Sequence, residues 1–218
     1  MYPCACTRAQ LRHLPRGSAG ETVSPGTCRS GARPAGLPPA LRFRLDPPSG
    51  TVCVDDALQG RCCQDVSTEI GDFVIHRRDG FFAYQLAVVV DDAAQGITRV
   101  VRGCDLLDHT PRQRLLQRAL GLAAPTYAHL PLVVEPDGTK LAKSRRSVPL
   151  DARVAPALLL TTLELLRQQP PAELAAADCS EILRWARGHW RPEVLAGRRI
   201  LAAPEPTRAW VAAPEALR

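Results

Sequence analysis

Apolar positions gather in short runs between residues 71 and 144, and polar turns separate the runs. Residues 86–90 and 97–101 are β-branched runs, and each of them stops at charged residues. Runs of this kind are typical of strands that are covered on both faces. Residues 130–134 form a third run, which leads into a turn containing Pro136 and Gly138. The pattern predicts an α/β fold.

A helix is predicted between the second and third runs. Thr110 is expected to cap it, Pro111 suits its first turn, Gln113 completes a capping box, and Gly121 ends it. Its apolar face contains Leu115, Leu116, Ala119 and Leu120. We therefore expect three basic side chains to face water, namely Arg112, Arg114 and Arg118.

The flanking sequence predicts further elements. Residues 71–75 are predicted to form a strand, and residues 42–45 a short edge strand. Residues 154–167 and 172–190, rich in Ala and Leu, predict two helices with a Pro pair between them. No run approaches the roughly 20 apolar residues of a membrane span, and no signal peptide is recognisable. We expect a cytoplasmic protein that is not associated with a membrane.

The net charge and the positions of the lysines indicate the first candidate binding residues. The net charge of +6 and pI near 9.1 are compatible both with nucleic-acid binding and with a solvated basic surface. Lys140 and Lys143 are the only lysines among 28 basic residues. A lysine ammonium reaches phosphate as a point charge, unlike the planar fork of arginine. The pair indicates either a phosphate-binding loop or an exposed basic loop.

Eight cysteines in a chain of this kind favour metal binding or incidental thiols over disulfides. Cys4, Cys6 and Cys28 are the candidate ligands, because thiolates held close together in a loop can bind zinc, which normally takes four ligands. By contrast, Cys53, Cys62 and Cys63 have no convincing partners, and we interpret them as small core residues.

The stretch that ends in the lysine pair resembles the class I aminoacyl-tRNA synthetases of the glutamate branch. Residues 140–144 (KLAKS) are similar to their Lys-Met-Ser-Lys-Ser loop, with Ala142 in place of a serine. Residues 82–96 (FAYQLAVVVDDAAQG) and 102–113 (RGCDLLDHTPRQ) look closer to the glutamyl-queuosine tRNA(Asp) synthetases than to full-length glutamyl-tRNA synthetases. The resemblance covers residues 1–144.

The resemblance implies the C-terminal half of a Rossmann-type catalytic domain. Residues 1–50 would form a zinc-type insertion with a connecting loop, 51–150 the second half of the catalytic domain, and 151–218 a helical tail. The implied reaction activates glutamate with ATP and transfers it to the queuosine base of tRNA(Asp), as a tRNA modification by a ligase. We expect a monomer.

The resemblance also assigns roles to single residues. Lys143, supported by Lys140, would contact the ATP phosphates during catalysis. Tyr84 and Arg102 would hold glutamate, and an arginine fork at the carboxyl end of a strand suits a carboxylate. We expect Asp91 and Asp92 to be structural or to position the substrate amine.

The implied zinc site departs from the family pattern. In the relatives, a tyrosine four residues before the last cysteine is the fourth ligand, and this chain has Ser24 there. A serine hydroxyl is a poor zinc ligand, so the fourth position is left to water, to His13 or to no ligand. Either one zinc ion binds or the loop has lost its metal.

The family's N-terminal half, with its His-x-Gly-His-type ATP motif, has no counterpart here. A misassigned start, a fragment and a chain that has lost catalysis all remain open. We expect the 218-residue chain alone to fold poorly and to be inactive. The alternatives to the ligase are a non-catalytic zinc-dependent RNA-binding module, or a degenerate remnant, and ordinary glutamyl transfer to the tRNA acceptor end.

Overall fold

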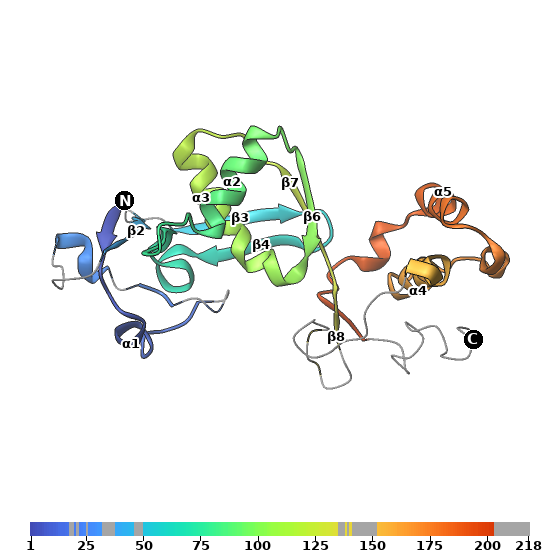
Figure 1. The fold of residues 1–218 in the computed structure, drawn as a ribbon, viewed down its shortest axis with the longest axis horizontal. Coiled ribbons are helices and arrows are strands. Elements are labelled where there is room, and N and C mark those ends of the chain that lie inside the picture. The colour runs from blue at the N-terminus through green and yellow to red at the C-terminus, as the bar shows by residue number, and fades with distance from the viewer. Residues whose placement is uncertain are drawn as a thin grey trace. The chain divides into compact units, whose positions relative to one another are not determined.

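The structure, a computed structural model, describes residues 1–17, 20, 22–24, 26–31, 38–45, 50–134, 138, 140 and 152–202. The chain divides into two units, Met1–Ala128 and His129–Arg218, and each is described by itself (Figure 1).

A four-stranded sheet in the order β4-β3-β7-β6 carries the centre of the first unit. β3 (Thr51–Asp56) and β4 (Gly60–Asp65) form an antiparallel hairpin, while β7 (Thr126–Leu130) runs parallel to β3. β6 (Arg99–Gly103) is one of the two outer strands, and its Val101 is 58% exposed. The predicted strand at 97–101 therefore exists, but it lies at an edge of the described sheet and is not buried on both faces.

Two helices of eleven residues pack on one side of this sheet (Figure 1). They are α2 (Tyr84–Ala94) and α3 (Thr110–Leu120). The prediction of a strand at 86–90 is wrong, because those residues lie inside α2. A five-residue apolar run fits both periodicities, and here the helix extends through the acidic pair that follows it.

The prediction for α3 was right in extent, but it was wrong about the cap, about Arg112 and about the end of the apolar face, where Leu120 is 49% exposed. Gly121 ends it in the left-handed region (φ 66°), as expected. Thr110 is the first residue of the helix and not its N-cap, which is His109, and the Thr110 hydroxyl donates to the Leu106 carbonyl. Arg112 is fully buried, not in water, and donates to the carbonyl oxygens of Asp108, Glu69 and Ile70.

A second sheet of the first unit joins segments that are far apart in the sequence. β1 (Tyr2–Cys4), β2 (Ala40–Phe43) and β5 (Phe73–His76) are antiparallel in the order β1-β2-β5. The predicted strand near residue 42 is therefore the central strand of three, not an edge. Short helix α1 (Arg8–Leu11) follows β1. The main core combines residues from both sheets and both long helices: Leu45, Val52, Val66, Ile70, Phe73, Ile75, Val89 and Leu116.

The hairpin of β3 and β4 corrects the interpretation of two cysteines. Cys53 and Cys63 lie opposite each other and form a disulfide, so they are not small core residues. Cys53 is partly buried and Cys63 is exposed. Because cross-strand partners depend on the register of the hairpin, their spacing alone did not reveal the pair.

The second unit contains a parallel pair of short strands and two helices. β8 (Leu132–Val134) pairs with β9 (Ile200–Ala202). α4 (Ala155–Leu165) agrees with the first predicted helix of the tail. In place of one helix over 172–190, a 3-10 turn at Ala172–Ala176 is followed by α5 (Cys179–His189), which Asp178 caps. Among the described residues, no helix is long and apolar enough to cross a membrane.

Candidate functional site

The three predicted metal ligands come together at one end of the first unit. Cys4 ends β1, Cys6 follows it closely, and Cys28 lies in the 3-10 turn Thr27–Ser30. Their sulfur atoms all lie within 4.8 Å of one another, and the Sγ atoms of Cys6 and Cys28 are 3.5 Å apart. With Zn–S bonds of about 2.3 Å, tetrahedral geometry places sulfur atoms about 3.8 Å apart. The three thiols therefore fit one zinc ion.

Neighbouring groups shift the pKa values of the Cys4 and Cys6 thiols. Burial and the hydrogen-bonding Cys28 and Cys4 thiols raise the pKa of Cys6 to about 12. Burial also acts to raise the pKa of Cys4, but hydrogen bonds from the Cys6 backbone and Arg42 lower it overall. Within the cluster, the Cys4 thiol is therefore easier to ionise than the Cys6 thiol.

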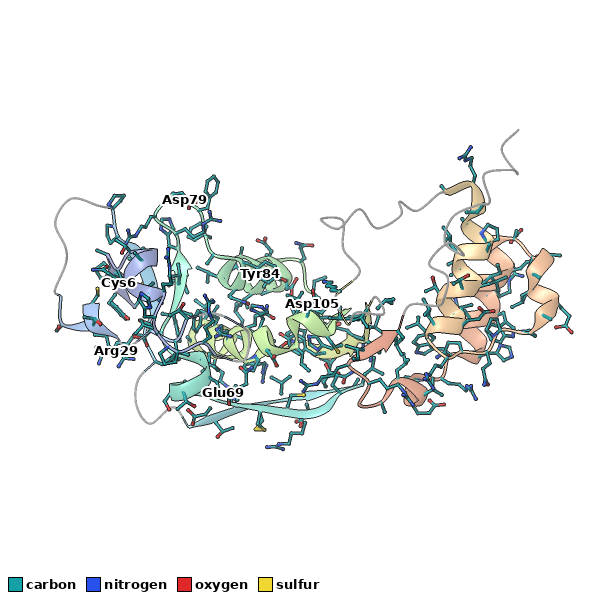
Figure 2. The ribbon with its side chains drawn as sticks, turned by 90° about the horizontal axis from the view of Figure 1, so that it is seen from below. Cys6, Arg29, Glu69, Asp79, Tyr84 and Asp105 are labelled. Carbon is teal, nitrogen blue, oxygen red and sulfur yellow. A yellow bond between two sulfur atoms is a disulfide. The ribbon has the colours of Figure 1, made fainter. Side chains whose placement is uncertain are left out.

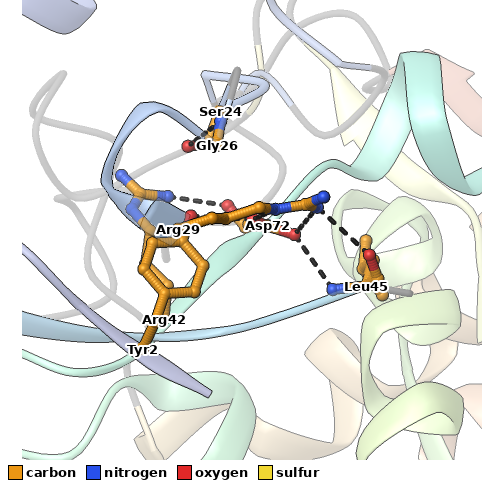
Figure 3. A network of polar contacts seen from close by, with 7 residues as sticks. All are labelled: Tyr2, Ser24, Gly26, Arg29, Arg42, Leu45 and Asp72. Atoms are coloured by element: carbon orange, nitrogen blue, oxygen red, sulfur yellow. Dashed lines mark hydrogen bonds and ion pairs between the residues drawn. The ribbon is translucent and has the colours of Figure 1, made fainter. Parts of the chain in front are cut away.

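One of the expected alternatives for the fourth ligand, His13, lies outside the cysteine cluster. Among the described residues, His13 is exposed and does not belong to the group of candidate ligands. Ser24 accepts a hydrogen bond from the Gly26 backbone at 3.4 Å (Figure 3). Water or no ligand at the fourth position stays a prediction, since the described part of the chain adds no histidine or carboxylate to the three sulfurs.

A buried carboxylate that the sequence analysis missed holds the cysteine segments in place (Figure 3). Asp72, 1% exposed, accepts hydrogen bonds from the Tyr2 hydroxyl, from the Leu45 backbone and, through both oxygens, from Arg29. Arg42 donates to the backbone carbonyl of Asp72 at 2.7 Å. Figure 2 shows Cys6 and Arg29 at the same end of the first unit.

The network shifts the pKa values of its members in opposite directions. Burial acts to raise the pKa of Asp72, but hydrogen bonds from Arg29, Leu45 and Tyr2 lower it overall. Burial and the bond to Asp72 raise the pKa of Tyr2 to about 12. The network is therefore built for an ionised Asp72 and a neutral Tyr2. No member of this network was predicted from the sequence.

The two predicted glutamate-binding residues lie on α2 and β6. Tyr84 is the first residue of α2 and is 52% exposed (Figure 2). Nη2 of Arg102 donates to Thr110 Oγ1 at 2.7 Å, to Gln113 Oε1 at 2.8 Å and to the Leu106 carbonyl at 3.4 Å. Its guanidinium carbon lies 5.4 Å from the centre of the Tyr127 ring. Arg102 is therefore a held side chain, not a mobile surface residue.

The remaining candidate residues have fewer described contacts than Arg102. Asp91 and Asp92 lie in the last turns of α2 and not at a strand end. Lys140 is exposed and forms an isolated antiparallel bridge with Val134. Lys143 lies outside the described residues.

Comparison with known proteins identifies the family. The model for the catalytic domain of class I tRNA synthetases (E and Q) matches residues 18–156. A glutamyl-Q tRNA(Asp) synthetase of Thiobacillus denitrificans is 48% identical over 94% of this chain and 67% of its own length. One from Pseudomonas aeruginosa (strain LESB58) is 53% identical over 87% of this chain and 61% of its own length.

Solved structures agree on the fold. The crystal structure of glutamate-tRNA synthetase from Elizabethkingia anophelis aligns with a TM-score of 0.65 at 20% identity, over 94% of this chain and 48% of that one. The expected α/β class is confirmed, and the chain spans roughly two thirds of the length of the curated relatives it matches. On this sequence similarity, the chain belongs to the class I tRNA synthetases (E and Q) and, within them, to the glutamyl-Q tRNA(Asp) synthetases.

Proposed function

We propose that this protein activates glutamate with ATP and transfers it to the queuosine base of tRNA(Asp). The observation that carries the proposal is the 48–53% identity to relatives named for this activity. The glutamate carboxylate would attack the α-phosphorus of ATP and release pyrophosphate. The acyl group of the adenylate would then pass to the base, and AMP would leave.

The chain's own residues supply charge and position for these steps. Arg102 and Tyr84 bind glutamate, since a guanidinium that hydrogen bonds hold in place is ready for a carboxylate. Lys143, supported by Lys140, stabilises the phosphates as pyrophosphate leaves. Adenylate formation needs alignment and charge stabilisation more than proton transfer, so Asp91 and Asp92 have no acid or base role.

The test is glutamylation of purified tRNA(Asp) by the protein isolated from its own cells, with radiolabelled glutamate and ATP. The proposal expects label in tRNA that contains queuosine and none in tRNA(Asp) that lacks it. Nuclease digestion should place the label in the anticodon fragment. Label at the acceptor end, or equal labelling of both tRNAs, would contradict the proposed acceptor.

We also propose that Cys4, Cys6 and Cys28 bind one structural zinc ion, which would fix the segment 1–31. Elemental analysis of protein purified without chelator should find about one zinc per chain. Cys28→Ser should lose the metal, because two thiolates and weak oxygen ligands remain. Cys62→Ser is the matched control, since Cys62 lies outside the cluster, and it should keep the zinc. Wild-type protein without zinc would show a loop that has lost its metal.

A further inference from the structure

A cavity of about 360 Å³ with a basic lining lies beside the cysteine cluster. Three apolar residues line it together with Cys4, Cys6, Arg42, Arg77, Arg78 and Asp79. Even with Cys4 as a thiolate, the arginines outnumber the anionic groups of this lining. An excess of cations in a concave site raises the local concentration of anions. The cavity therefore suits a negatively charged ligand.

One of these arginines has a buried donor that the fold leaves without an acceptor. Arg42 on β2 is 6% exposed, and its Nη1 donates to the backbone carbonyl of Asp72 at 2.7 Å. Its side chain also forms a hydrogen bond with the Cys4 thiol. Within the described part of the chain, Nε of Arg42 has no hydrogen-bond partner. A buried N–H without an acceptor is unfavourable, and an anion in the cavity would supply one.

The other two arginines begin the turn that leads from β5 to α2. The Arg77 amide donates to the Phe81 carbonyl at 2.8 Å, so the turn closes on itself. Nη2 of Arg78 donates to the carbonyl oxygen of Cys6 at 2.8 Å, which is a neutral acceptor. Arg77 forms an ion pair with Asp79, and these side chains are 57% and 46% exposed. Because an exposed ion pair is weak, Arg77 can exchange its carboxylate partner for a phosphate.

The same turn ends in two exposed aromatic side chains. Phe81 is 67% exposed and Phe82 is 65% exposed. The Phe82 ring lies edge-on to the His76 ring, with 5.3 Å between their centres. Proteins bind unpaired nucleotides with this combination, in which aromatic rings stack on bases and arginines bind phosphates. An acidic peptide or a free phosphate would use the arginines but would leave both rings in water.

The turn lies close to the proposed glutamate site. Phe81 is three residues before Tyr84, so their Cα atoms are at most about 11 Å apart. We propose that an unpaired nucleotide of the tRNA, next to the base that accepts glutamate, binds here. Its phosphate lies in the cavity on the three arginines, and its base stacks on Phe81 or Phe82. This inference rests on the proposed function, which supplies tRNA(Asp) as the RNA and places the acceptor base in the anticodon.

The test is binding of fluorescently labelled tRNA(Asp) that contains queuosine, measured by anisotropy at several salt concentrations. The protein is purified from its own cells, with each substitution introduced into the chromosomal gene. Arg77→Gln should raise the Kd about tenfold and make the dependence of log Kd on log salt shallower by about 0.7, because one phosphate contact is lost. Phe81→Ala should raise the Kd about tenfold and leave the salt dependence unchanged, because stacking involves no counterion release.

Two exposed residues outside the turn provide matched controls. Arg61 on β4 is an exposed arginine whose distance to Asp55 is 3.9 Å, so Arg61→Gln removes the same charge as Arg77→Gln. Leu120 is 49% exposed at the end of α3, so Leu120→Ala removes an exposed apolar side chain. Both controls should bind tRNA(Asp) with the Kd and the salt dependence of the wild type.

Asp79→Asn separates an electrostatic role from damage to the turn. This substitution removes the only carboxylate in the described lining, so it should lower the Kd for tRNA(Asp) about threefold. A raised Kd in Asp79→Asn would show that the turn acts only through its structure, and this would overturn the inference. Weaker binding in Arg77→Gln but not in Phe81→Ala would overturn the nucleotide as the ligand.

The outcomes also separate this inference from the proposed function. If the wild type glutamylates tRNA(Asp) while Arg77→Gln, Phe81→Ala and Asp79→Asn all keep its Kd, the inference is overturned and the proposed function remains. If the wild type neither binds nor glutamylates tRNA(Asp), both are overturned.

Discussion

At the scale of single residues, Asp72 organises the cysteine end of the first unit. Its two oxygens accept four hydrogen bonds from Tyr2, Arg29 and Leu45, which are 27 to 70 residues away in the sequence. The carboxylate is fully buried, whereas 32% of the Arg29 side chain is exposed. Removal of one partner of a buried ion pair leaves the other without compensation, and this is more damaging than loss of a surface pair.

We predict that Asp72→Asn lowers the free energy of unfolding by about 3 kcal/mol, because the amide group turns a donor toward other donors. Urea denaturation at pH 7 measures the change. Asp55→Asn is the control, since Asp55 is exposed and its ion pair with Arg61 is 3.9 Å long. The control should change stability by less than about 0.5 kcal/mol. Equal effects of the two substitutions would contradict the central role of Asp72.

The lowered pKa of Asp72 predicts a dependence of stability on pH. Since the folded-state pKa lies below the ordinary value of about 3.9, the ionised form contributes its stabilisation above that pH. The stabilisation is lost as the pH falls below about 4 toward the folded-state pKa. Unfolding free energies measured from pH 7 down to pH 2 should fall less steeply in Asp72→Asn than in the wild type. If Asp72→Asn and the wild type lose stability equally steeply with falling pH, other groups are responsible for the acid sensitivity.

At the scale of elements, local signals predicted some boundaries correctly, whereas long-range contacts and one ambiguous apolar run caused errors. Gly121 ended α3 as expected, because a left-handed residue after a helix is a local requirement. Arg112 was expected in water, but the carbonyl groups of Glu69 and Ile70 that bury it come from a segment more than 40 residues away. The 86–90 run was assigned to a strand because its length alone did not distinguish strand from helix.

In the candidate site too, residues in local motifs were predicted, and residues that act through long-range contacts were not. Tyr84, Arg102 and the cysteine cluster were expected from motifs, and the thiols do gather within 4.8 Å. The residues around them were missed. Gln85 and Gln113, whose side chains share a hydrogen bond, are 28 residues apart, and Tyr2 and Asp72 are 70 apart. The sequence around a glutamine or an aspartate contains no pattern that predicts a hydrogen-bond partner so far away in the chain.

The β3–β4 hairpin gives a prediction about thiol chemistry. Reduction of the Cys53–Cys63 disulfide should lower the free energy of unfolding by about 2 kcal/mol, because it frees a short loop in the unfolded chain. Thermal unfolding with and without dithiothreitol measures the shift in Tm. Cys63→Ser should remove the response to dithiothreitol, whereas Cys62→Ser should retain it. An equal response in wild type and Cys63→Ser would show that other thiols are responsible.

At the scale of the whole molecule, apolar side chains are exposed next to the candidate site. Phe81 and Phe82, in the turn before α2, are 67% and 65% exposed, and Val101 on β6 is 58% exposed. An outer strand with apolar residues is an open edge that favours association with other polypeptide. The chain also spans only part of the length of its relatives.

We therefore predict that the 218-residue chain alone does not catalyse glutamate-dependent exchange of pyrophosphate into ATP. The proposed binding of glutamate by Arg102 and Tyr84 would be a separate property, because exchange also needs contacts that align ATP. The assay uses labelled pyrophosphate, with protein from the native cells as the positive control. The intact mass of that protein, compared with 23.7 kDa, should accompany the assay. Detectable exchange by the 218-residue chain would refute the prediction.

The hydrogen bonds that join Tyr2 and Arg29 to Asp72 can form only after Asp72 has been synthesised. The three thiols are made by residue 28, but the carboxylate that joins their segments comes 44 residues later. At about 5–20 residues per second, a ribosome needs roughly 2–9 seconds to cover that interval. During this time Cys4, Cys6 and Cys28 are on a chain that cannot yet close around them. The nascent chain is therefore the form in which the thiols are most open to a metal ion or to an oxidant.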